Sequence, residues 1–573
     1  MSDGVKLWTI TIDPSPHSGE KKGAVICRSP YGPATQHLAD IFGFKNGLVM
    51  VLQDDRGTWR SSGQFDMWRG AAEDDIETFD WIISQPWSNG EVSTVGISAD
   101  GISSATVILK SPTMIKAQWF AWTTMQGHHF SYPGGAYRLD LTEGYLNTMN
   151  IIDGYAAERV IAEVRDHEGW SQWWYNLTAC RDVASPTLPT CHYQQIKWPL
   201  LFSAGQWDIF MKSQLGAWAG IRMDSDPAVR DKHVLFIGPL GHCLWQWDHF
   251  PQLASGELSG LLQAIEVMSE FMAGRTDGPA RSKIGRINIY VMGAFGDTKL
   301  QRPGNYWTSL DEFPETTPTS LYLAAGDKLS YTKPEAAAEV QYQYDPKNPA
   351  PMIGGSNLPG VGAIAICGPA DQTPRHNRPD VLVFTGSRLR EEVVVAGNVF
   401  VRLYVSSSAK DTDFFATVED VTPSLLIWRK PMSYLVRYGV ARMRWRESDE
   451  KQSEALEQDK IYEAVIDCGF IAYVFEEGHQ IRVTVSSSAS PYYNANSNSG
   501  YSEVANKTVP TVVASNIVHI GGASASEVIL PVSSLNKLPR NEHMDWNIPD
   551  TLLKPTQPTG RASGVNEPDK IIV

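Results

Sequence analysis

Apolar and polar residues alternate along the first 110 residues in the order expected for strand, helix and strand. Three apolar runs, GAVICRSPYG (23–32), GLVMVLQDDRG (47–57) and EVSTVGIS (91–98), each pass into polar or glycine residues. Before the third run, residues 73–88 carry apolar side chains at helical spacing behind several acidic residues, where the helix dipole favours negative charge. The pattern predicts βαβ units around a mostly parallel sheet, as in an α/β protein.

The pattern changes between residues 112 and 196, which are rich in aromatic residues and include an amphipathic helical stretch at 154–170. An insertion of this kind between strands of an α/β sheet commonly forms a cap over a pocket. The sheet pattern then resumes, with strands expected at 197–208, 232–242 and 287–294 and a helix near 258–273. We therefore expect a helical cap inserted into the sheet domain.

Helical signals fade after about residue 315. Short alternating strands separated by Gly, Asn, Asp and Ser residues follow, at 393–408, 411–422, 460–470 and 479–488. This pattern is typical of an antiparallel β-sandwich. The predicted domains are a core in two parts (1–111 and 197–314), a cap (112–196) and a β domain with a proline-rich tail (315–573).

The charge balance of the chain limits its partners. The 573 residues include 64 acidic and 49 basic side chains, and the net charge of -15 repels nucleic acids and anionic lipid surfaces. The sequence shows neither a signal peptide nor an apolar run long enough to cross a membrane. We therefore expect a cytoplasmic protein that binds no nucleic acid and no membrane.

Six scattered cysteines, at positions 27, 180, 191, 243, 367 and 468, form no CxxC motif. Their spacing indicates neither a zinc site nor a disulfide framework. Reduced thiols are the expectation, Cys243 being a packed thiol, with a short loop closed by Cys180 and Cys191 as the alternative. Adjacent His128 and His129 point apart in most backbones, which argues against a metal site.

The stretch VGISADGISS (95–104) contains a candidate nucleophile. Ser98 stands between Gly96 and Gly101, after an apolar strand and before a helical pattern. A nucleophilic serine needs a hydroxyl raised on a tight strand-to-helix turn, where crowding requires small neighbours. An ordinary serine in a glycine-bearing turn is the alternative.

Two later strand ends favour the catalytic interpretation of Ser98. Asp208 follows the apolar strand LLFSAGQWD, and His242 follows the next strand, HVLFIGPLGH. The carboxyl ends of parallel strands meet at one edge of the sheet, where open α/β sheets bind ligands. The order Ser, Asp, His is that of α/β-hydrolase triads, in which the carboxylate orients the imidazole that takes the serine proton. Taken alone, Asp208 also fits a loop-capping residue and His242 a surface histidine.

A set of motifs is spread over almost the whole chain. They are DGVKL (3–7), RSPY (28–31), QDDRG with SSGQF (53–65), QPWSNG (85–90), the Ser98 turn, YPGGAYR (132–138), AGQWDIF (204–210), GPLGH (238–242), DTDFFATVEDV (411–421) and SSSASPYYNANSNSG (486–500). Through this set the chain resembles the cocaine esterase and Xaa-Pro dipeptidyl peptidase family of serine hydrolases, which includes α-amino-acid ester hydrolases and glutaryl acylases. The resemblance implies an α/β-hydrolase core with a helical cap and a C-terminal jelly-roll-like β domain.

The resemblance also implies roles for single residues. Ser98 matches the nucleophile of the family, Asp208 the acid and His242 the base. Tyr31 matches the tyrosine whose phenol forms the oxyanion hole together with the backbone N–H after the serine, here that of Ala99. Two such donors in a site shielded from water stabilise the transition state by several kcal/mol, roughly 3 kcal/mol per donor. Without the family, a packed aromatic is the simpler interpretation of Tyr31.

One position departs from the family pattern. A tyrosine usually follows the serine, whereas this chain has Ala99 and then Asp100. We expect the smaller Ala99 to widen the site near the acyl carbon. Asp100 either faces solvent, contacts substrate or stabilises the helix N-terminus, and the helix role is favoured.

Aromatic residues of the cap and Phe210 match positions that line the substrate pocket in the family. The candidates besides Phe210 are Trp119, Trp122, Trp170 and Trp173, each with packing in the cap core as its alternative. A peptidase that selects a free N-terminus would need a carboxylate for the ammonium group. The cap offers Asp140, Glu143, Glu158 and Glu163, each equally explained as a solvated helix charge.

These observations predict a serine hydrolase without metal or cofactor. We expect it to cleave a carboxylic ester or amide of a small organic molecule through an acyl-enzyme intermediate. The alternatives are an acyltransferase or biosynthetic tailoring enzyme with the same triad, an X-Pro dipeptidyl peptidase, and a catalytically inactive protein whose β domain binds a partner. The family resemblance also makes a homodimer or higher assembly an expectation.

Overall fold

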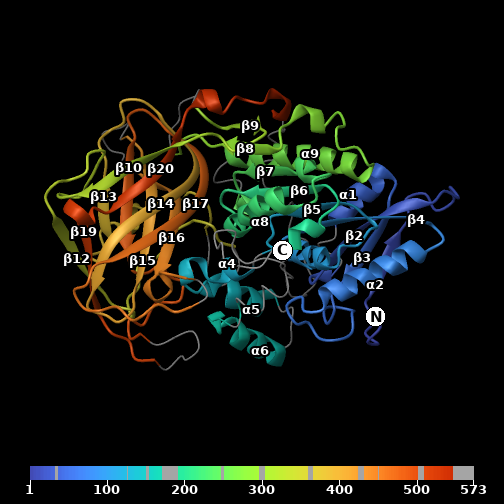
Figure 1. Cartoon of the computed structure of the whole chain (residues 1–573), viewed down its shortest axis with the longest axis horizontal. Coiled ribbons are helices and arrows are strands. Elements are labelled where there is room, and N and C mark those ends of the chain that lie inside the picture. The colour runs from blue at the N-terminus through green and yellow to red at the C-terminus, as the bar shows by residue number, and fades with distance from the viewer. Residues whose placement is uncertain are drawn as a thin grey trace, which may run out of the picture.

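The computed structural model divides into a half with helices around a sheet and a half made of strands (Figure 1). It describes residues 1–32, 37–125, 127–149, 154–168, 170, 192–246, 251–295, 303–358, 366–423, 431–448, 451–500 and 509–545. In Figure 1 the β domain lies on the left, the sheet-and-helix core on the right and the cap helices below them.

The core contains a nine-stranded sheet with the order β1-β3-β2-β4-β5-β6-β7-β8-β9. Its strands are β1 (Thr9–Ile12), β2 (Lys22–Ser29), β3 (Val49–Asp54), β4 (Ser88–Ile97), β5 (Ile115–Ala121), β6 (Leu200–Gly205), β7 (Val234–Gly238), β8 (Ile287–Val291) and β9 (Tyr306–Leu310). Strands β2 to β8 pair in parallel, and β1 and β9 add antiparallel edges. Most of the parallel strands are buried on both faces, which explains their continuous apolar sequences.

Helices cover both faces of this sheet. They are α1 (His37–Asn46), α2 (Ala71–Ser84), α3 (Ala99–Ala105), α8 (Met211–Asp224) and α9 (Pro251–Met272). Phe42 of α1 and Phe271 of α9 belong to one buried cluster, whereas Phe79 of α2 and Trp218 of α8 belong to another. The α/β class predicted from the sequence is confirmed.

The cap begins after β5, because β5 lies within the first sheet although the sequence analysis placed residues 112–121 in the cap. Trp119 and Phe120 of β5 pack into the two different clusters, as consecutive side chains of a central strand do. This aromatic pair therefore marks a buried strand. The helical segments of the cap are α4 (Gly127–Ser131), a π-helical turn (Asp140–Gly144), α5 (Tyr145–Met149) and α6 (Gly154–Val164).

The second half is a mostly antiparallel β-sandwich. Its strands are β10 (Thr317–Ala324), β11 (Lys328–Ser330), β12 (Ala338–Tyr344), β13 (Leu382–Thr385), β14 (Val393–Ser407), β15 (Asp413–Val421), β16 (Ser433–Arg442), β17 (Tyr462–Phe475), β18 (Gln480–Ser486), β19 (Ala514–Ile520) and β20 (Glu527–Ser533). Nearly all neighbours pair antiparallel, and β11 pairs with β13 in parallel. The four segments predicted as strands become β14, β15, β17 and β18. The predicted tail from residue 546 lies outside the described residues.

Short 3₁₀ segments connect these elements. They span Thr106–Lys110, Pro133–Gly135, His192–Gln195, Arg230–Lys232, Gly241–Gln246, Arg281–Lys283, Thr373–Arg375, Met443–Trp445, Gly522–Ser524, Leu535–Lys537 and Glu542–Met544. The segment Gly241–Gln246 follows β7 at the carboxyl edge of the first sheet, so it carries His242 to the position where α/β sheets bind ligands.

The two halves share backbone hydrogen bonds. The Met292 N–H donates to the Ala472 carbonyl at 2.9 Å, and the Val474 N–H donates to the Met292 carbonyl at 3.0 Å. The buried Gln206 side chain accepts from the Ala472 N–H at 2.6 Å and donates to the Tyr290 carbonyl at 2.7 Å. Strand β17 thus forms backbone hydrogen bonds with the core at Met292, the residue directly after β8.

A disulfide joins the loop after β7 to the β domain. Cys243 and Cys367 are bonded, with their Cα atoms 5.8 Å apart and a sequence separation of 124. The expectation of reduced thiols is therefore wrong for this pair, since a bond between such distant positions leaves no spacing signal in the sequence. Cys27 and Cys468 are free and buried, and the alternative pair Cys180 and Cys191 lies outside the described residues.

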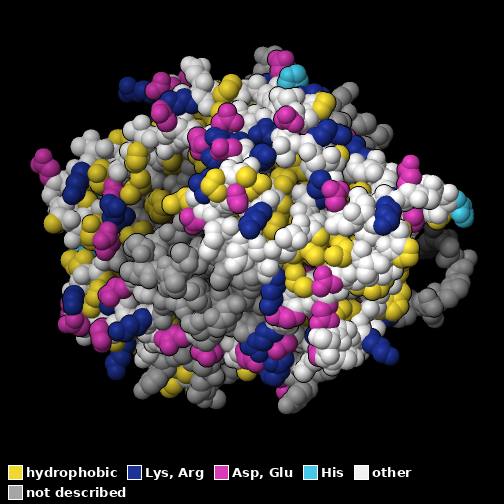
Figure 2. Space-filling view, turned by 45° about the vertical axis from the view of Figure 1, so that its right-hand side comes forward, with side chains coloured by type: hydrophobic (Ala, Val, Ile, Leu, Met, Phe, Trp, Pro, Cys, Tyr) yellow, Lys and Arg dark blue, Asp and Glu magenta, His cyan; other side chains and the backbone are white. Residues whose placement is uncertain are grey.

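The exposed surface carries mixed charges. On the face in Figure 2, Lys and Arg side chains are interspersed with Asp and Glu side chains. Ion pairs such as Lys45–Glu266 at 2.5 Å and Arg286–Glu312 at 2.7 Å are examples of this mixing. Within the described ranges, no helix combines the length and the apolar character that a membrane crossing requires.

Candidate active site

Ser98 lies at the turn between β4 and α3. Its φ of 57° and ψ of -125° place it in the region that side chains other than glycine rarely occupy, a strain typical of nucleophilic serines on α/β-hydrolase turns. The Ser98 N–H donates to the Ala121 carbonyl at 3.0 Å, and the Thr123 hydroxyl donates to the Ser98 carbonyl at 2.6 Å. Both partners belong to β5 or directly follow it, so the neighbouring strand holds the strained turn.

Gly96 and Gly101 have no side chain because the turn leaves no space for one. A Cβ on Gly96 would lie 2.5 Å from the carbonyl carbon of Asp100, and a Cβ on Gly101 would lie 2.6 Å from the Thr123 side chain. Both distances are well below van der Waals contact. The sequence argument that crowding requires small residues around Ser98 is confirmed.

Asp208 and His242 form a buried pair beyond β6 and β7. Asp208 Oδ2 lies 2.5 Å from His242 Nδ1 and accepts the His242 backbone N–H at 2.9 Å. Asp208 Oδ1 accepts the Phe210 N–H at 2.8 Å. The carboxylate therefore fixes both the ring and the backbone of His242, and its bond to Nδ1 leaves Nε2 to act on a proton of the substrate or of a nucleophile.

His242 and Ser98 are not joined by a hydrogen bond from His242 Nε2 in the described part of the structure. His242 Nε2 is buried and makes no hydrogen bond within the described part of the chain. The imidazole packs against the Phe210 ring, with centroids 5.6 Å apart, and against the Trp122 ring at 6.5 Å. Hydrogen bonds between catalytic groups often tighten only when substrate binds, so the open link leaves the predicted relay untested.

Tyr31 and Ser98 line the same cavity. The Tyr31 phenol lies 2.5 Å from the Tyr145 phenol, and its role in an oxyanion hole stays a prediction. Burial raises the pKa of Tyr31, so the phenol keeps its proton at neutral pH. Tyr145 was not predicted from the sequence, because a tyrosine at the start of a short cap helix belongs to no recognisable motif.

Ala99 and Asp100 point to different surroundings. Ala99 begins α3 and lines the cavity at Ser98. Asp100 is 2% exposed, lies in the first turn of α3 and accepts a long hydrogen bond from the Cys27 thiol at 3.8 Å. Asp100 does not line this cavity, which agrees with the favoured helix role.

A small cavity of about 40 Å³ opens in front of Ser98. Its lining consists of apolar side chains and hydroxyl groups from the core, the cap and the β domain: Tyr31, Met67, Trp68, Ser98, Ala99, Ile102, Phe130, Leu141, Thr142, Tyr145, Leu146, Ile209, Phe210 and Leu358. Of the residues that the structure describes, no Asp, Glu, Lys, Arg or His contributes to this lining.

Phe210 lines this cavity, whereas three of the predicted tryptophans do not. Trp119 is fully buried in the core, where its indole N–H donates to Ser203 at 3.0 Å. Trp122 lies beside His242, and Trp170 packs in the cap with its N–H bonded to Ser131 at 3.2 Å. The alternative of core packing holds for Trp119 and Trp170, since aromatic density alone cannot separate wall from core. Trp173 lies outside the described residues.

Three of the four candidate carboxylates of the cap form ion pairs with arginines. Asp140 forms a buried pair with Arg138 at 2.9 Å, and Glu143 pairs with Arg165 at 2.7 Å. Glu163 pairs with Arg69 and Arg159 on the surface, and Glu158 is exposed. None of these carboxylates lines the cavity at Ser98.

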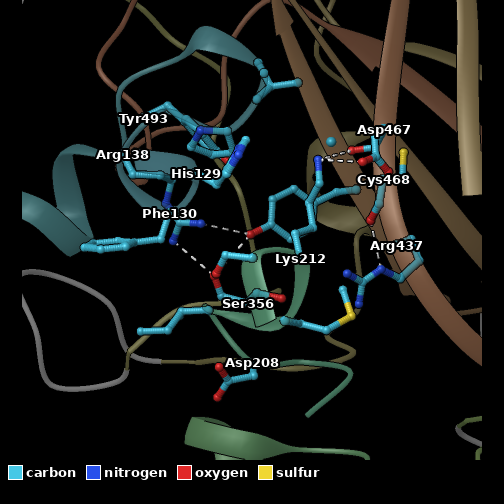
Figure 3. Close-up of a pocket in the computed structure, with 18 residues that line it drawn as sticks. His129, Phe130, Arg138, Asp208, Lys212, Ser356, Arg437, Asp467, Cys468 and Tyr493 are labelled. Carbon is cyan, nitrogen blue, oxygen red and sulfur yellow. Dashed lines mark hydrogen bonds and ion pairs between the residues drawn. The ribbon is translucent and has the colours of Figure 1, made fainter. Parts of the chain in front are cut away.

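A second cavity, of about 60 Å³, lies where the core, cap and β domain meet and reaches Asp208 (Figure 3). The charged groups in its wall are partnered within the protein. Lys212 pairs with Asp467 at 2.8 Å, and the Arg437 Nε–H donates to the Cys468 carbonyl at 3.0 Å. Arg138 donates to the Ser356 carbonyl at 3.0 Å. This cavity therefore lies at a polar junction between the domains, on the side of the site where Asp208 lies.

Metal ligands do not gather anywhere in the described ranges, where no group of three or more His, Cys, Asp or Glu side chains is placed to hold an ion. The fold, the strained serine turn and the Asp–His pair define the chain as a serine hydrolase of the α/β-hydrolase type.

Comparison with known proteins agrees with this class. Residues 3–244 match the X-Pro dipeptidyl-peptidase (S15 family), and residues 286–529 match the X-Pro dipeptidyl-peptidase C-terminal non-catalytic domain. The cocaine esterase of Rhodococcus sp. (strain MB1 Bresler) is 26% identical over 596 residues, which cover 93% of this chain and 97% of the relative. The chain belongs to the S15 family of hydrolases that includes the CocE/NonD-type enzymes.

Solved structures share the whole architecture. An aminopeptidase from the marine sediment archaeon Thaumarchaeota archaeon superposes with a TM-score of 0.74 at 22% identity, covering 93% of this chain and 95% of that one. An α-amino acid ester hydrolase superposes with a TM-score of 0.71 at 22% identity and the same coverage. At this level of identity, the likeness shows the fold alone.

Proposed function

We propose that the protein hydrolyses esters of small, uncharged carboxylic acids through an acyl-enzyme intermediate on Ser98. In this mechanism His242 Nε2 takes the Ser98 proton, and Ser98 Oγ attacks the carbonyl carbon. The Tyr31 phenol and the Ala99 backbone N–H stabilise the oxyanion. His242 then protonates the leaving alcohol and activates the water that releases the acid, while Asp208 stabilises the imidazolium.

The cavity at Ser98 is the observation that carries this proposal. The described residues in its walls contribute apolar side chains and hydroxyl groups, and an ionised acyl group would lose its hydration there without gaining a partner of opposite charge from them. An apolar acyl group, by contrast, gains free energy from burial in such a cavity. Selection of an uncharged acyl group follows.

The same observation argues against a peptidase that recognises a free N-terminus. Such an enzyme needs a carboxylate within reach of the ammonium group, whereas Asp140 and Glu143 pair with arginines and do not line the cavity. The relatives that are named aminopeptidase and α-amino acid ester hydrolase therefore supply a fold for comparison, and we assign this chain the esterase reaction of the relative named cocaine esterase.

The test compares two series of substrates with the same leaving group. We expect the purified protein to hydrolyse p-nitrophenyl esters of aliphatic and aromatic acids, with kcat/KM at least about 10²-fold above that for the matching α-amino acid esters, a difference of about 2.7 kcal/mol. Equal or higher kcat/KM for the amino acid esters would overturn the assigned substrate class. Adding an alcohol acceptor and measuring product partition distinguishes hydrolysis from acyl transfer.

Ser98→Ala tests the nucleophile. We expect it to abolish turnover and fluorophosphonate labelling with a nearly unchanged Tm, because removing one hydroxyl from a strained turn costs no packing. Ser104→Ala is the matched control, since Ser104 lies in the same helix and donates to the Gly101 carbonyl at 3.1 Å. Retained turnover in Ser98→Ala would mean that another residue is the nucleophile.

The cytoplasmic location and the homodimer stay predictions from the sequence.

A further inference from the structure

Two buried carboxylates hold the backbone just before and at His242. Glu257, on α9, is 4% exposed, and its Oε2 accepts the Leu240 N–H at 2.6 Å and the Gly241 N–H at 3.2 Å. The next N–H in the chain, that of His242, donates to Asp208 Oδ2 at 2.9 Å. Three consecutive backbone donors are thus bound by the catalytic acid and by a second carboxylate that the proposed reaction does not use.

The GPLGH motif leaves room for both carboxylates. Gly238 ends β7, and a Cβ at this position would lie 2.5 Å from Glu257 Oε2. Gly241 has a φ of 62°, and a Cβ on it would lie 2.6 Å from the Asp208 Cβ. Each glycine therefore gives space to one carboxylate, which indicates that the loop and Glu257 form one packed arrangement.

The charge of Glu257 changes near neutral pH. Burial raises the pKa of Glu257 to about 7, the Leu240 and Gly241 N–H groups lower it, and the charge of Asp208 raises it. Tyr290 on β8 also faces Glu257 and has a raised pKa because of burial.

We propose that Glu257 is a positioning residue for the base, acting through the backbone of Leu240 and Gly241 and through its negative charge behind Asp208. The inference rests on the proposed function, because it takes His242 as the base. The negative charge of an ionised Glu257, together with that of Asp208, favours the imidazolium that forms when His242 takes the Ser98 proton. A neutral Glu257 keeps a carbonyl oxygen that accepts both N–H groups, so the geometric and the charge effects are separable.

Two substitutions separate these effects. Glu257→Gln keeps an oxygen acceptor and removes the charge, so the rise of kcat with pH near 7 that comes from ionisation of Glu257 is expected to be lost, with little change in KM. Glu257→Ala removes the acceptor as well, and kcat is expected to fall by about tenfold or more, since small displacements of a catalytic group have large effects on rate. If Glu257→Ala does not fold, Gly238→Ala takes its place. The added methyl group crowds Glu257 and should cause the same loss in kcat.

Glu270 provides the matched control. It lies on the same helix, is 6% exposed and accepts two backbone N–H groups, from Ala280 at 2.7 Å and Arg281 at 2.9 Å, but it does not contact the loop of His242. We expect Glu270→Gln and Glu270→Ala to change Tm without changing the pH profile.

The outcomes are distinct. A Glu257→Gln profile identical to wild type, or equal effects of the Glu257 and Glu270 variants on kcat and pH profile, would overturn the inference and leave Glu257 as a fold-stabilising residue. Fluorophosphonate labelling of wild-type Ser98 is measured in parallel. Absence of labelling there would instead overturn the proposed function.

Discussion

The proposed nucleophile side, around Ser98, and the proposed base side, around His242, are built in different ways. Around Ser98 and Tyr31 the protein uses a strained backbone, hydroxyl groups and apolar walls. Around His242 it uses buried carboxylates, Asp208 and Glu257, that bind backbone N–H groups. On the nucleophile side the described groups that line the cavity are neutral, with the buried Asp100 carboxylate outside that lining, whereas the base side places two carboxylates directly on the loop of His242.

This difference has a chemical reason. The oxyanion develops on the nucleophile side, where a carboxylate would repel it in a medium of low dielectric constant. The imidazolium develops on the base side, where a carboxylate stabilises it. Separating the two kinds of group allows one small site to stabilise both charges of the same transition state.

Apart from removal of the proposed nucleophile itself in Ser98→Ala, the largest expected effect lies on the base side. Asp208→Asn keeps the size of the side chain but no longer fixes the imidazole tautomer and charge, so we expect kcat to fall by about 10³- to 10⁴-fold. Steady-state kinetics with the preferred ester, together with Tm, checks this. A loss of less than tenfold with a normal Tm would mean that Asp208 does not orient the base.

On the nucleophile side, Tyr31→Phe removes one oxyanion donor. We expect a fall in kcat of roughly 10²-fold with little change in KM, because the donor acts mainly in the transition state. Tyr132→Phe, a buried tyrosine that donates to the Val164 carbonyl at 2.6 Å, is the control away from the reaction. An effect confined to KM would make Tyr31 only a wall of the cavity.

The smallest effect is expected for a carboxylate that belongs to neither side. Glu143→Gln breaks the pair with Arg165 outside the cavity, so kcat/KM should stay within about twofold for both esters and amino acid esters, as for other partly exposed ion pairs. The two substrate series check this. A selective loss of kcat/KM with the amino acid esters would show that the cap recognises an ammonium group, and it would contradict the comparison of the two sides.

Much of the architecture could be predicted because each element carries its own pattern. Buried parallel strands such as β2 and β7 appear as continuous apolar runs, and the strands of the β domain alternate. Asp208 and His242 could be found because each directly follows such a run. Ser98 could be found because the crowded turn forces glycines on both sides of it.

The rest depended on contacts between distant segments. The bond between Cys243 and Cys367 has no local signal, and Glu257 resembles any acidic residue within an apolar helix until the loop before His242 is placed against it. Trp119 shows the opposite limit, because an aromatic residue of a buried strand and one of a pocket wall have the same sequence appearance. Tertiary packing decides such positions.

The hydrogen bonds of Met292 with Ala472 and Val474 bear on any attempt to obtain a minimal catalytic fragment. Cutting the polypeptide ahead of the second half would leave the N–H and carbonyl of Met292, directly after β8, without these partners and would remove the Ala472 N–H that donates to Gln206. A fragment that ends there should therefore be less stable than the whole chain, and a foreign second half would have to restore the same backbone hydrogen bonds.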